Sequence, residues 1–137
     1  MVAVMRKRIG NDGVRIVLGA VTVVDDDGDR ARALARREVA MYLAVVAELD
    51  PTVSLEPELL ERVRNLLAAG DDEAAGAQIS SDVLARFAFA GTPAELVAHA
   101  EAVFAAGAER IDFGTPHGEP ERRGLELLCA EVLPRLR

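Results

Sequence analysis

The chain has 137 residues, a net charge of −7 and a pI of about 4.8, which argues against non-specific binding to nucleic acids or to anionic membranes. Its single cysteine, Cys129, excludes an intramolecular disulfide and the usual cysteine-rich zinc sites. No apolar run approaches the ~20 residues of a membrane span, and no signal-peptide-like stretch follows the basic residues near the N-terminus. We therefore expect a cytoplasmic protein that forms one domain.

The N-terminal part predicts one buried strand. Residues 1–13 finish in the turn signal Gly10-Asn11-Asp12-Gly13 and are interpreted as the end of a preceding helix and its turn. Residues 15–24 are an almost continuous β-branched run, as expected of a strand in the middle of a parallel sheet. The acidic run Asp25–Asp29 is well placed to cap the helix that follows.

Three helices are predicted next, over residues 29–49, 57–70 and 71–80, with a break at Asp50-Pro51. The first helix has one apolar stripe at helical spacing, expected to face the core. The stripe comprises Leu34, Met41, Val45 and Leu49, joined by Ala31, Ala35 and Tyr42. Its arginines at positions 30, 32, 36 and 37 are expected on a solvated face.

The last third, from Phe87 to the end, carries the strongest indication of function. A strand at 86–90 runs into Gly91-Thr92-Pro93 and a helix, and a strand at 109–114 runs into Gly114–Gly118 and a last helix. Such a βαβα pattern requires a parallel sheet, and we expect all three strands to be parallel and adjacent in chain order. Ligands bind at the carboxyl ends of strands in such sheets.

The two Gly-Thr-Pro segments differ in how far they point to a ligand. Thr92-Pro93-Ala94-Glu95 is a capping box, which accounts for it locally, although Gly91 and Thr92 also place free N–H groups at a helix N-terminus that could bind an anion. The segment Gly114-Thr115-Pro116-His117-Gly118 is longer than a minimal link. Its glycines permit close backbone approach, and His117 titrates near neutrality, although a surface role for this histidine is equally open.

Other polar positions favour structural roles. Asp112, inside a strand, is expected to pair with Arg86 or Arg110; Arg86 could instead meet a phosphate. His99 is expected to be solvated. Cys129 is expected to fill the core on the apolar face of the last helix.

The residues FAFAGTPAELVAHAEAVFAAGAERIDFGTPHG, with the earlier VLGAVTVVDDDGDRARALARREVAMYLAVVAELDP, resemble the C-terminal end of the bacterial-luciferase-like superfamily. The nearest likeness is to coenzyme F420-dependent methylenetetrahydromethanopterin reductases. The resemblance implies an α/β fold: residues 1–137 would form a single C-terminal portion of a TIM (β/α)8 barrel, about its last three βα units, with extra helices between the first two strands. Complete barrels need roughly 250 residues.

The resemblance further implies part of an F420- or flavin-dependent oxidoreductase, a reductase or luciferase-like monooxygenase. Coenzyme F420, or alternatively FMN, would bind at a rim formed by Gly91, Thr92 and Gly114–Gly118 (Gly114, Thr115, Pro116, His117 and Gly118), with Arg86 as a weaker candidate for its phosphate. No catalytic or metal-binding residue is implied here. A fragment of this kind would need the missing barrel half or a second copy. The alternatives are a non-catalytic half-barrel interaction subunit and, less strongly, a small phosphate-binding module.

Overall fold

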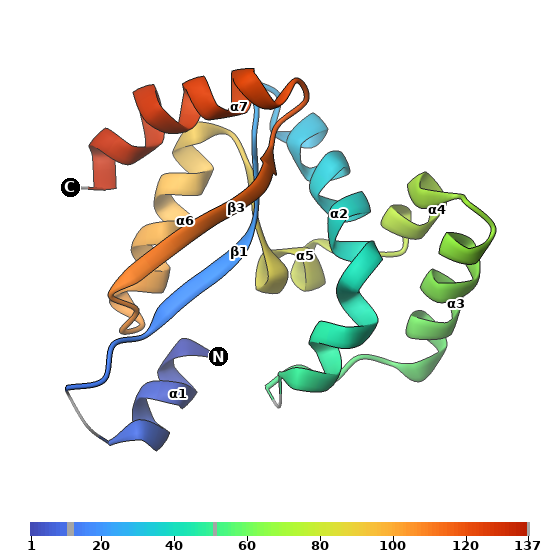
Figure 1. Cartoon of the computed structure of the whole chain (residues 1–137), viewed down its shortest axis with the longest axis horizontal. Coiled ribbons are helices and arrows are strands. Elements are labelled where there is room, and N and C mark those ends of the chain that lie inside the picture. Colours follow the sequence, from blue (N-terminus) through green and yellow to red (C-terminus); the bar gives the residue numbers. More distant parts are fainter. Residues whose placement is uncertain (11–12, 51, 137) are drawn as a thin grey trace.

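The computed structural model describes residues 1–10, 13–50 and 52–136 (Figure 1). It shows a three-stranded parallel sheet between two groups of helices. In chain order the elements are α1 (Val2–Ile9), β1 (Val17–Val24), α2 (Gly28–Leu49), α3 (Pro57–Ala68), α4 (Asp72–Ala77), α5 (Ser81–Phe87), β2 (Ala88–Gly91), α6 (Pro93–Ala105), β3 (Arg110–His117) and α7 (Glu121–Leu127), followed by a π-helical turn (Leu128–Val132) and a 3-10 turn (Leu133–Leu136).

Two predicted boundary signals fall partly outside the described residues. These are the turn at Gly10–Gly13, which includes residues 11 and 12, and the break at Asp50-Pro51, which includes residue 51. The described part of the chain agrees with both positions, because α1 ends at Ile9 and α2 ends at Leu49.

The sheet has the order β2-β1-β3 and all its pairings are parallel. The prediction of three parallel strands is thus confirmed, but the prediction that they are adjacent in chain order is wrong. β1 and β3 each have eight residues and pair along most of their length, whereas β2 has four and pairs only with Val21–Val24. Pairing β3 with β1 therefore satisfies more backbone groups than pairing it with β2.

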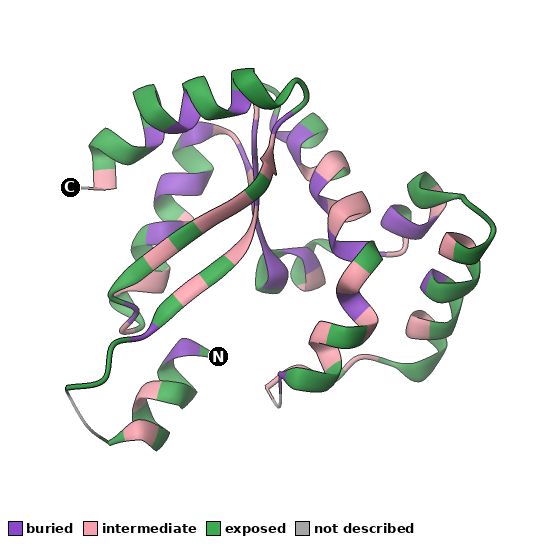
Figure 2. Cartoon of the chain, in the orientation of Figure 1, coloured by how far each residue is buried: buried purple, intermediate pink, exposed green. Residues whose placement is uncertain are grey.

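Helices pack against both faces of the sheet at its carboxyl half, while the amino halves of β1 and β3 keep exposed residues on one face (Figures 1 and 2). Because successive side chains of a strand point to opposite faces, Val23 packs with α2–α5 while its neighbour Val24 packs with α6 and the last helix. Both are 1% exposed, so the prediction of a strand covered on both faces holds for the carboxyl end of β1, whereas Val17 at its amino end is 51% exposed. Phe89 of β2 is also buried, and its replacement by Ala would cost about 3–5 kcal/mol.

The buried face of α2 differs from the predicted one. Met41, Val45 and Leu49 are exposed, at 56%, 63% and 76%. The core side consists of small and medium residues that allow close approach to α4 and to the sheet, and it includes Ala31 and Ala35 of the predicted stripe. Its residues are Ala31, Ala35, Val39, Ala40 and Leu43. Size explains the error, because counting large apolar side chains gives too little weight to alanines at a close helix contact.

The last helix shows a similar shift. Cys129 is exposed and does not fill the core, contrary to expectation. The buried positions are Gly124, Leu127, Leu128 and Val132, so Leu128 and Val132 lie on the buried face as expected, whereas Leu125 is exposed together with Cys129. Position 124 must be glycine at this contact, because a Cβ there would collide with the His117 carbonyl group.

Local helix-end chemistry agrees with the sequence. The side chain of Asp27 caps α2 by accepting from the backbone N–H groups of Asp29 (3.0 Å) and Arg30 (3.3 Å). Pro57 lies in the first turn of α3, and Thr92 and Glu95 form the predicted capping box of α6. Among the described residues, no helix combines the length and apolar character needed to cross a bilayer.

Candidate functional site at the carboxyl edge of the sheet

The structure brings the two Gly-Thr-Pro segments to one edge of the sheet. Gly91 at the end of β2 pairs with Val24, and His117 at the end of β3 pairs with Val23. The N–H of Asp25 donates to the carbonyl oxygen of Gly91 at 3.2 Å, which holds the ends of β1 and β2 together. Both segments therefore follow the carboxyl ends of parallel strands, where α/β folds bind ligands.

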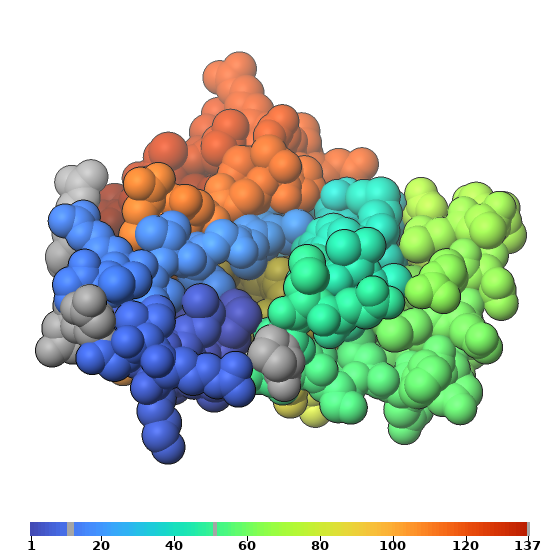
Figure 3. Space-filling view, turned by 60° about the horizontal axis from the view of Figure 1, so that its bottom comes forward, coloured from blue at the N-terminus to red at the C-terminus, as the bar shows by residue number. Residues whose placement is uncertain are grey.

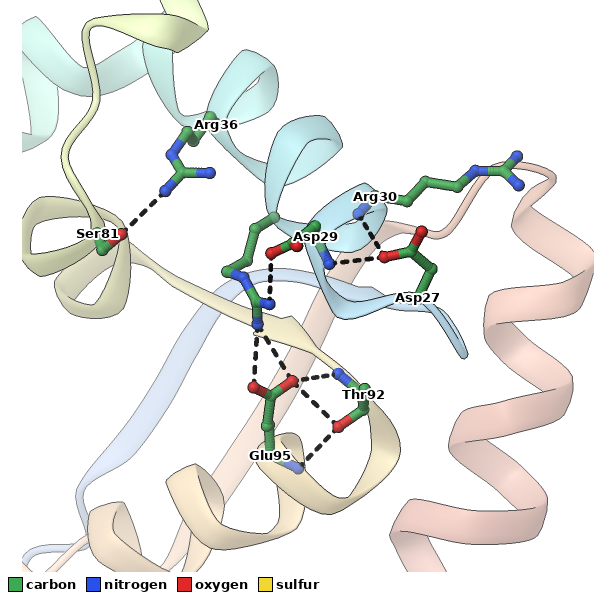
Figure 4. Close-up of polar contacts among 8 residues, drawn as sticks. Asp27, Asp29, Arg30, Arg36, Ser81, Thr92 and Glu95 are labelled. Atoms are coloured by element: carbon green, nitrogen blue, oxygen red, sulfur yellow. Dashed lines mark hydrogen bonds and ion pairs between the residues drawn. The ribbon is translucent and has the colours of Figure 1, made fainter.

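In the first segment, Gly91-Thr92-Pro93, the carboxylate of Glu95 occupies the N-terminal end of α6. Thr92 N–H donates to Glu95 Oε2 at 2.7 Å, and Glu95 N–H donates to Thr92 Oγ1 at 3.4 Å (Figure 4). Arg32 of α2 donates to both Glu95 oxygens at 3.1 Å and to Asp29 at 2.8 Å. The backbone hydrogen bond from Thr92 is the main cause that lowers the pKa of Glu95, and the bond to Asp29 chiefly raises that of Arg32.

This network decides between the two interpretations of the segment. The Glu95 carboxylate already lies on the N-terminal N–H groups of α6, so an anion bound there would meet like charge. A Cβ at Gly91 would lie 2.5 Å from Glu95 Oε2, at a φ of +148° that side chains rarely adopt. The structural role of the capping box is therefore favoured over a phosphate site on this helix end.

The second segment is not a loop over its whole length. Gly114–His117 continue strand β3, which was expected to end at residue 114. Its glycines are approached by the chain itself: a Cβ on Gly114 would lie 2.8 Å from the Ala20 carbonyl oxygen, and one on Gly118 would lie 3.2 Å from that of Val24. Tight backbone packing thus accounts for both glycines. Thr115 is the exposed side chain of this segment, while Pro116 is half-buried.

His117 is held between β3 and α7, with 13% of its side chain exposed. Nε2 lies 3.1 Å from the carbonyl oxygen of Phe113, so the neutral ring carries its proton on Nε2. Nδ1 is buried without a hydrogen-bond partner among the described residues and lies 3.5 Å from Glu121 Oε1. The ring nitrogen Nδ1 can therefore accept a hydrogen bond at the rim of the edge.

Arg86 is not brought to this edge. It lies in the last turn of α5, before β2 begins, and therefore at the amino end of the strands, away from Gly91. The arginines that do reach the carboxyl edge are on α2, where the sequence indicated only a solvated face. Arg30 donates to the Glu119 carbonyl oxygen at 2.8 Å, and Arg37 lies 3.3 Å from the Glu119 carboxylate. Their seven-residue spacing, which puts them on one helix face, was the available signal.

Two further predicted side chains have definite partners. Asp112 pairs with Arg110 at 2.6 Å, which confirms one of the two expected ion pairs. His99 is half-buried rather than solvated, with its ring centroid 4.6 Å from that of Phe89, and burial lowers its pKa. Within the described ranges, no three His, Cys, Asp or Glu side chains are grouped so that they could hold a metal ion.

Comparison with known proteins gives a consistent set of relatives, although no family model matches the chain. The chain is 28% identical over 134 residues to the 5,10-methylenetetrahydromethanopterin reductase of Archaeoglobus fulgidus, covering 92% of this chain and 40% of the relative. It is 24% identical to the reductase of the same name from Methanopyrus kandleri, covering 96% and 38%.

The fold comparison agrees. The solved structure of the coenzyme F420 dependent tetrahydromethanopterin reductase from Methanopyrus kandleri matches with a TM-score of 0.77 and 25% identity, over 96% of this chain and 39% of that one. The chain spans about two fifths of the length of these relatives. The predicted α/β fold class, a partial TIM barrel, is thereby confirmed. The predicted resemblance is confirmed as well: by sequence and fold, the chain is a relative of the F420-dependent methylenetetrahydromethanopterin reductases of the luciferase-like superfamily and corresponds to a part of their length.

Proposed function

We propose that the chain is part of an oxidoreductase that transfers hydride between coenzyme F420 and a small organic substrate, and that it forms one rim of the cofactor site. The observation that carries this proposal is the meeting of both Gly-Thr-Pro segments at the carboxyl edge of a parallel sheet, in a relative of F420-dependent reductases. F420 is favoured over FMN because F420 is the cofactor named for the solved relative. When bound, the deazaflavin would accept or supply the hydride.

The side chains at this edge are suited to contacting the cofactor and not to taking part in hydride transfer. Thr115 offers an exposed hydroxyl, and His117 Nδ1 offers a buried acceptor without a partner among the described residues. Gly91, Thr92, Gly114, Pro116 and Gly118 would shape the backbone around the cofactor. We assign no catalytic residue to this chain. Arg86 is no longer assigned to the rim, because it lies at the opposite end of the strands.

The second candidate function is a non-catalytic subunit that binds other polypeptides. It is favoured by the exposed apolar side chains Met41, Val45 and Leu49 on α2. Both functions are compatible with a requirement for a further polypeptide, and F420 binding discriminates between them.

The test uses fluorescence titration with F420, and separately with FMN, on the chain purified from its own cells together with any polypeptide that stays bound. We expect Thr115→Glu to weaken F420 binding at least about tenfold, since it puts a carboxylate beside an anionic cofactor; tenfold corresponds to about 1.4 kcal/mol. Val17→Glu is the matched control, because Val17 is an exposed strand residue (51%) at the other end of the sheet. No F420 binding, or equal affinities of the two variants, would remove the rim from the cofactor site.

A further inference from the structure

A second recess lies at the amino end of the strands, away from the proposed cofactor edge. It is a cavity of about 390 Å³ between Met1, β1, the C-terminal half of α2, α5, β2 and α6, and most of its lining is apolar. Figure 3 shows a hollow between β1 and the end of α2, with the yellow α5–β2 segment at its base. Its volume lies in the range of ligand pockets, roughly 300–1,000 Å³.

The cavity exists because β2 is short. The β1–β2 ladder begins at the pair Val21–Ala88, since the chain is still helical at Phe87. On that side of β1, the residues before Val21 face no strand. The space beside Leu18 and Ala20 is therefore left between helices.

Three polar side chains line this cavity without a hydrogen bond to any described residue: Tyr42, His99 and Arg86. Burial raises the pKa of Tyr42 to about 12 and lowers that of His99, so both are neutral at pH 7. Tyr42 thus presents a hydroxyl donor, and Arg86 presents a positive charge with five donors.

The lining also holds one carboxylate, whose hydrogen bonds go to a residue other than Arg86. Asp50 is buried and its Oδ1 accepts from the Thr52 N–H at 2.8 Å and from the Thr52 hydroxyl at 2.7 Å. Asp50 and Arg86 are near enough to interact electrostatically, but they form no ion pair within 4.0 Å in the described part of the chain. The guanidinium group therefore keeps its donors available.

We propose that this cavity binds a short apolar carboxylate. The aliphatic part would lie against Leu18, Ala20, Val46 and Phe89, and the carboxylate would face Arg86 with Tyr42 as a second donor. A cationic ligand would meet like charge at Arg86, and a neutral amide would lose the charge-assisted bond. The site is separate from the proposed cofactor rim, since its residues lie at the opposite end of the same strands.

The composition of the chain makes the test direct. Proton NMR can follow the ring signals of the single tyrosine and the two histidines without interference from tryptophan, which is absent. Tyr42 and His99 report on the cavity, and His117 at the other edge is an internal control. Titration with hexanoate should shift the Tyr42 and His99 signals saturably, with a Kd on the order of millimolar, as befits eight non-hydrogen atoms, and leave His117 unchanged.

Two comparisons sharpen the test. Hexanamide, a neutral isostere, should bind at least about fivefold more weakly than hexanoate (about 1 kcal/mol). Arg86→Gln should remove this preference, whereas Arg64→Gln, at an exposed arginine of α3 without a hydrogen bond or ion pair to described residues, should preserve it.

Several results would overturn the proposal. They are the absence of saturable shifts up to ~50 mM ligand, equal movement of His117, equal affinity for the amide, and equal behaviour of the two arginine variants. Shifts of Tyr42 and His99 that depend on protein concentration alone would also overturn it, because they would mean that another polypeptide segment fills the cavity.

Discussion

At the scale of single residues, burial separates side chains that the sequence treats alike. Met41 and Tyr42 are neighbours on α2, yet Met41 is exposed and Tyr42 is half-buried beside the cavity. The two histidines also differ: His99 stacks on Phe89, while His117 is tied to the Phe113 carbonyl group. None of these environments follows from residue type, because each depends on how the surrounding backbone folds.

Tyr42 gives a prediction at this scale. Burial raises its pKa to about 12, with a further contribution from the charge of Glu38. Absorbance titration of the folded chain should therefore show tyrosinate forming with a midpoint near 12, against about 10 in denaturant. Because the folded state binds the proton more tightly, the associated stability is complete below pH 10 and is lost as the pH rises from about 10 to 12.

The measurement is clean because Tyr42 is the only tyrosine. Circular dichroism at each pH shows whether the chain is still folded. A midpoint near 10 in a chain that is still folded would contradict the burial of the Tyr42 hydroxyl.

At the scale of elements, the network of Arg32, Thr92 and Glu95 joins the N-terminal turns of α2 and α6. Thr92→Ala should lower the free energy of unfolding by about 1 kcal/mol, the usual effect of losing an N-cap side chain. Thr115→Ala is the control, because Thr115 is exposed and caps no helix. Equal denaturant midpoints for the two variants would show that this cap contributes nothing.

Glu95 adds a pH dependence to the same network. Its pKa is lowered, so the stabilisation it provides is present above its ordinary value of 4.5 and is lost as the pH falls through the lower folded value. Glu95→Gln should therefore destabilise the chain at pH 7, by less than about 1 kcal/mol since the side chain is half-exposed, and the difference should shrink below pH 4.5. Glu61→Gln, at an exposed residue of α3, should show no such dependence.

These elements also show what the sequence can and cannot predict. The cap at Asp27 and the capping box at Thr92 act within four residues, so the sequence alone identified them. The order of the strands was not predictable in this way, because it depends on which edge of β1 gains the longer ladder with β3. For the site, the sequence located both Gly-Thr-Pro segments, but it could not show that Ala20 and Val24 approach their glycines. Arg86 was misplaced because it belongs to the last turn of α5, directly before the amino end of β2, and not to the carboxyl end of the strand.

At the scale of the whole molecule, the chain leaves apolar side chains exposed on its surface. Its relative from Archaeoglobus fulgidus is more than twice as long and so has more residues that could cover such a surface. A three-stranded piece of a barrel with two open edges should leave Val17, Ala20 or Val21, and Phe89 half-buried. Val17 is 51% exposed and Ala20 and Val21 are half-buried, but Phe89 is fully buried, which contradicts this expectation for that residue. β3 is an edge strand with an unpaired side, and such edges favour association unless they are covered. Met41 and Val45 add an exposed apolar strip on α2.

We therefore expect the isolated chain to associate at tens of micromolar, roughly the range in which exposed apolar surface drives aggregation. Sedimentation velocity should give a weight-average mass above the 14.6 kDa of one chain, with enhanced ANS fluorescence. The double variant Met41→Lys/Val45→Lys should lower both signals, because it replaces apolar contact area with charge. Ala69→Lys/Ala130→Lys adds the same two charges at exposed positions, just after α3 and in the π-helical turn, and should change them less. A monomer that does not enhance ANS fluorescence would contradict this prediction. It would show that neither the exposed strip on α2 nor the open edge of β3 causes association, and that the chain is stable in solution without a further polypeptide.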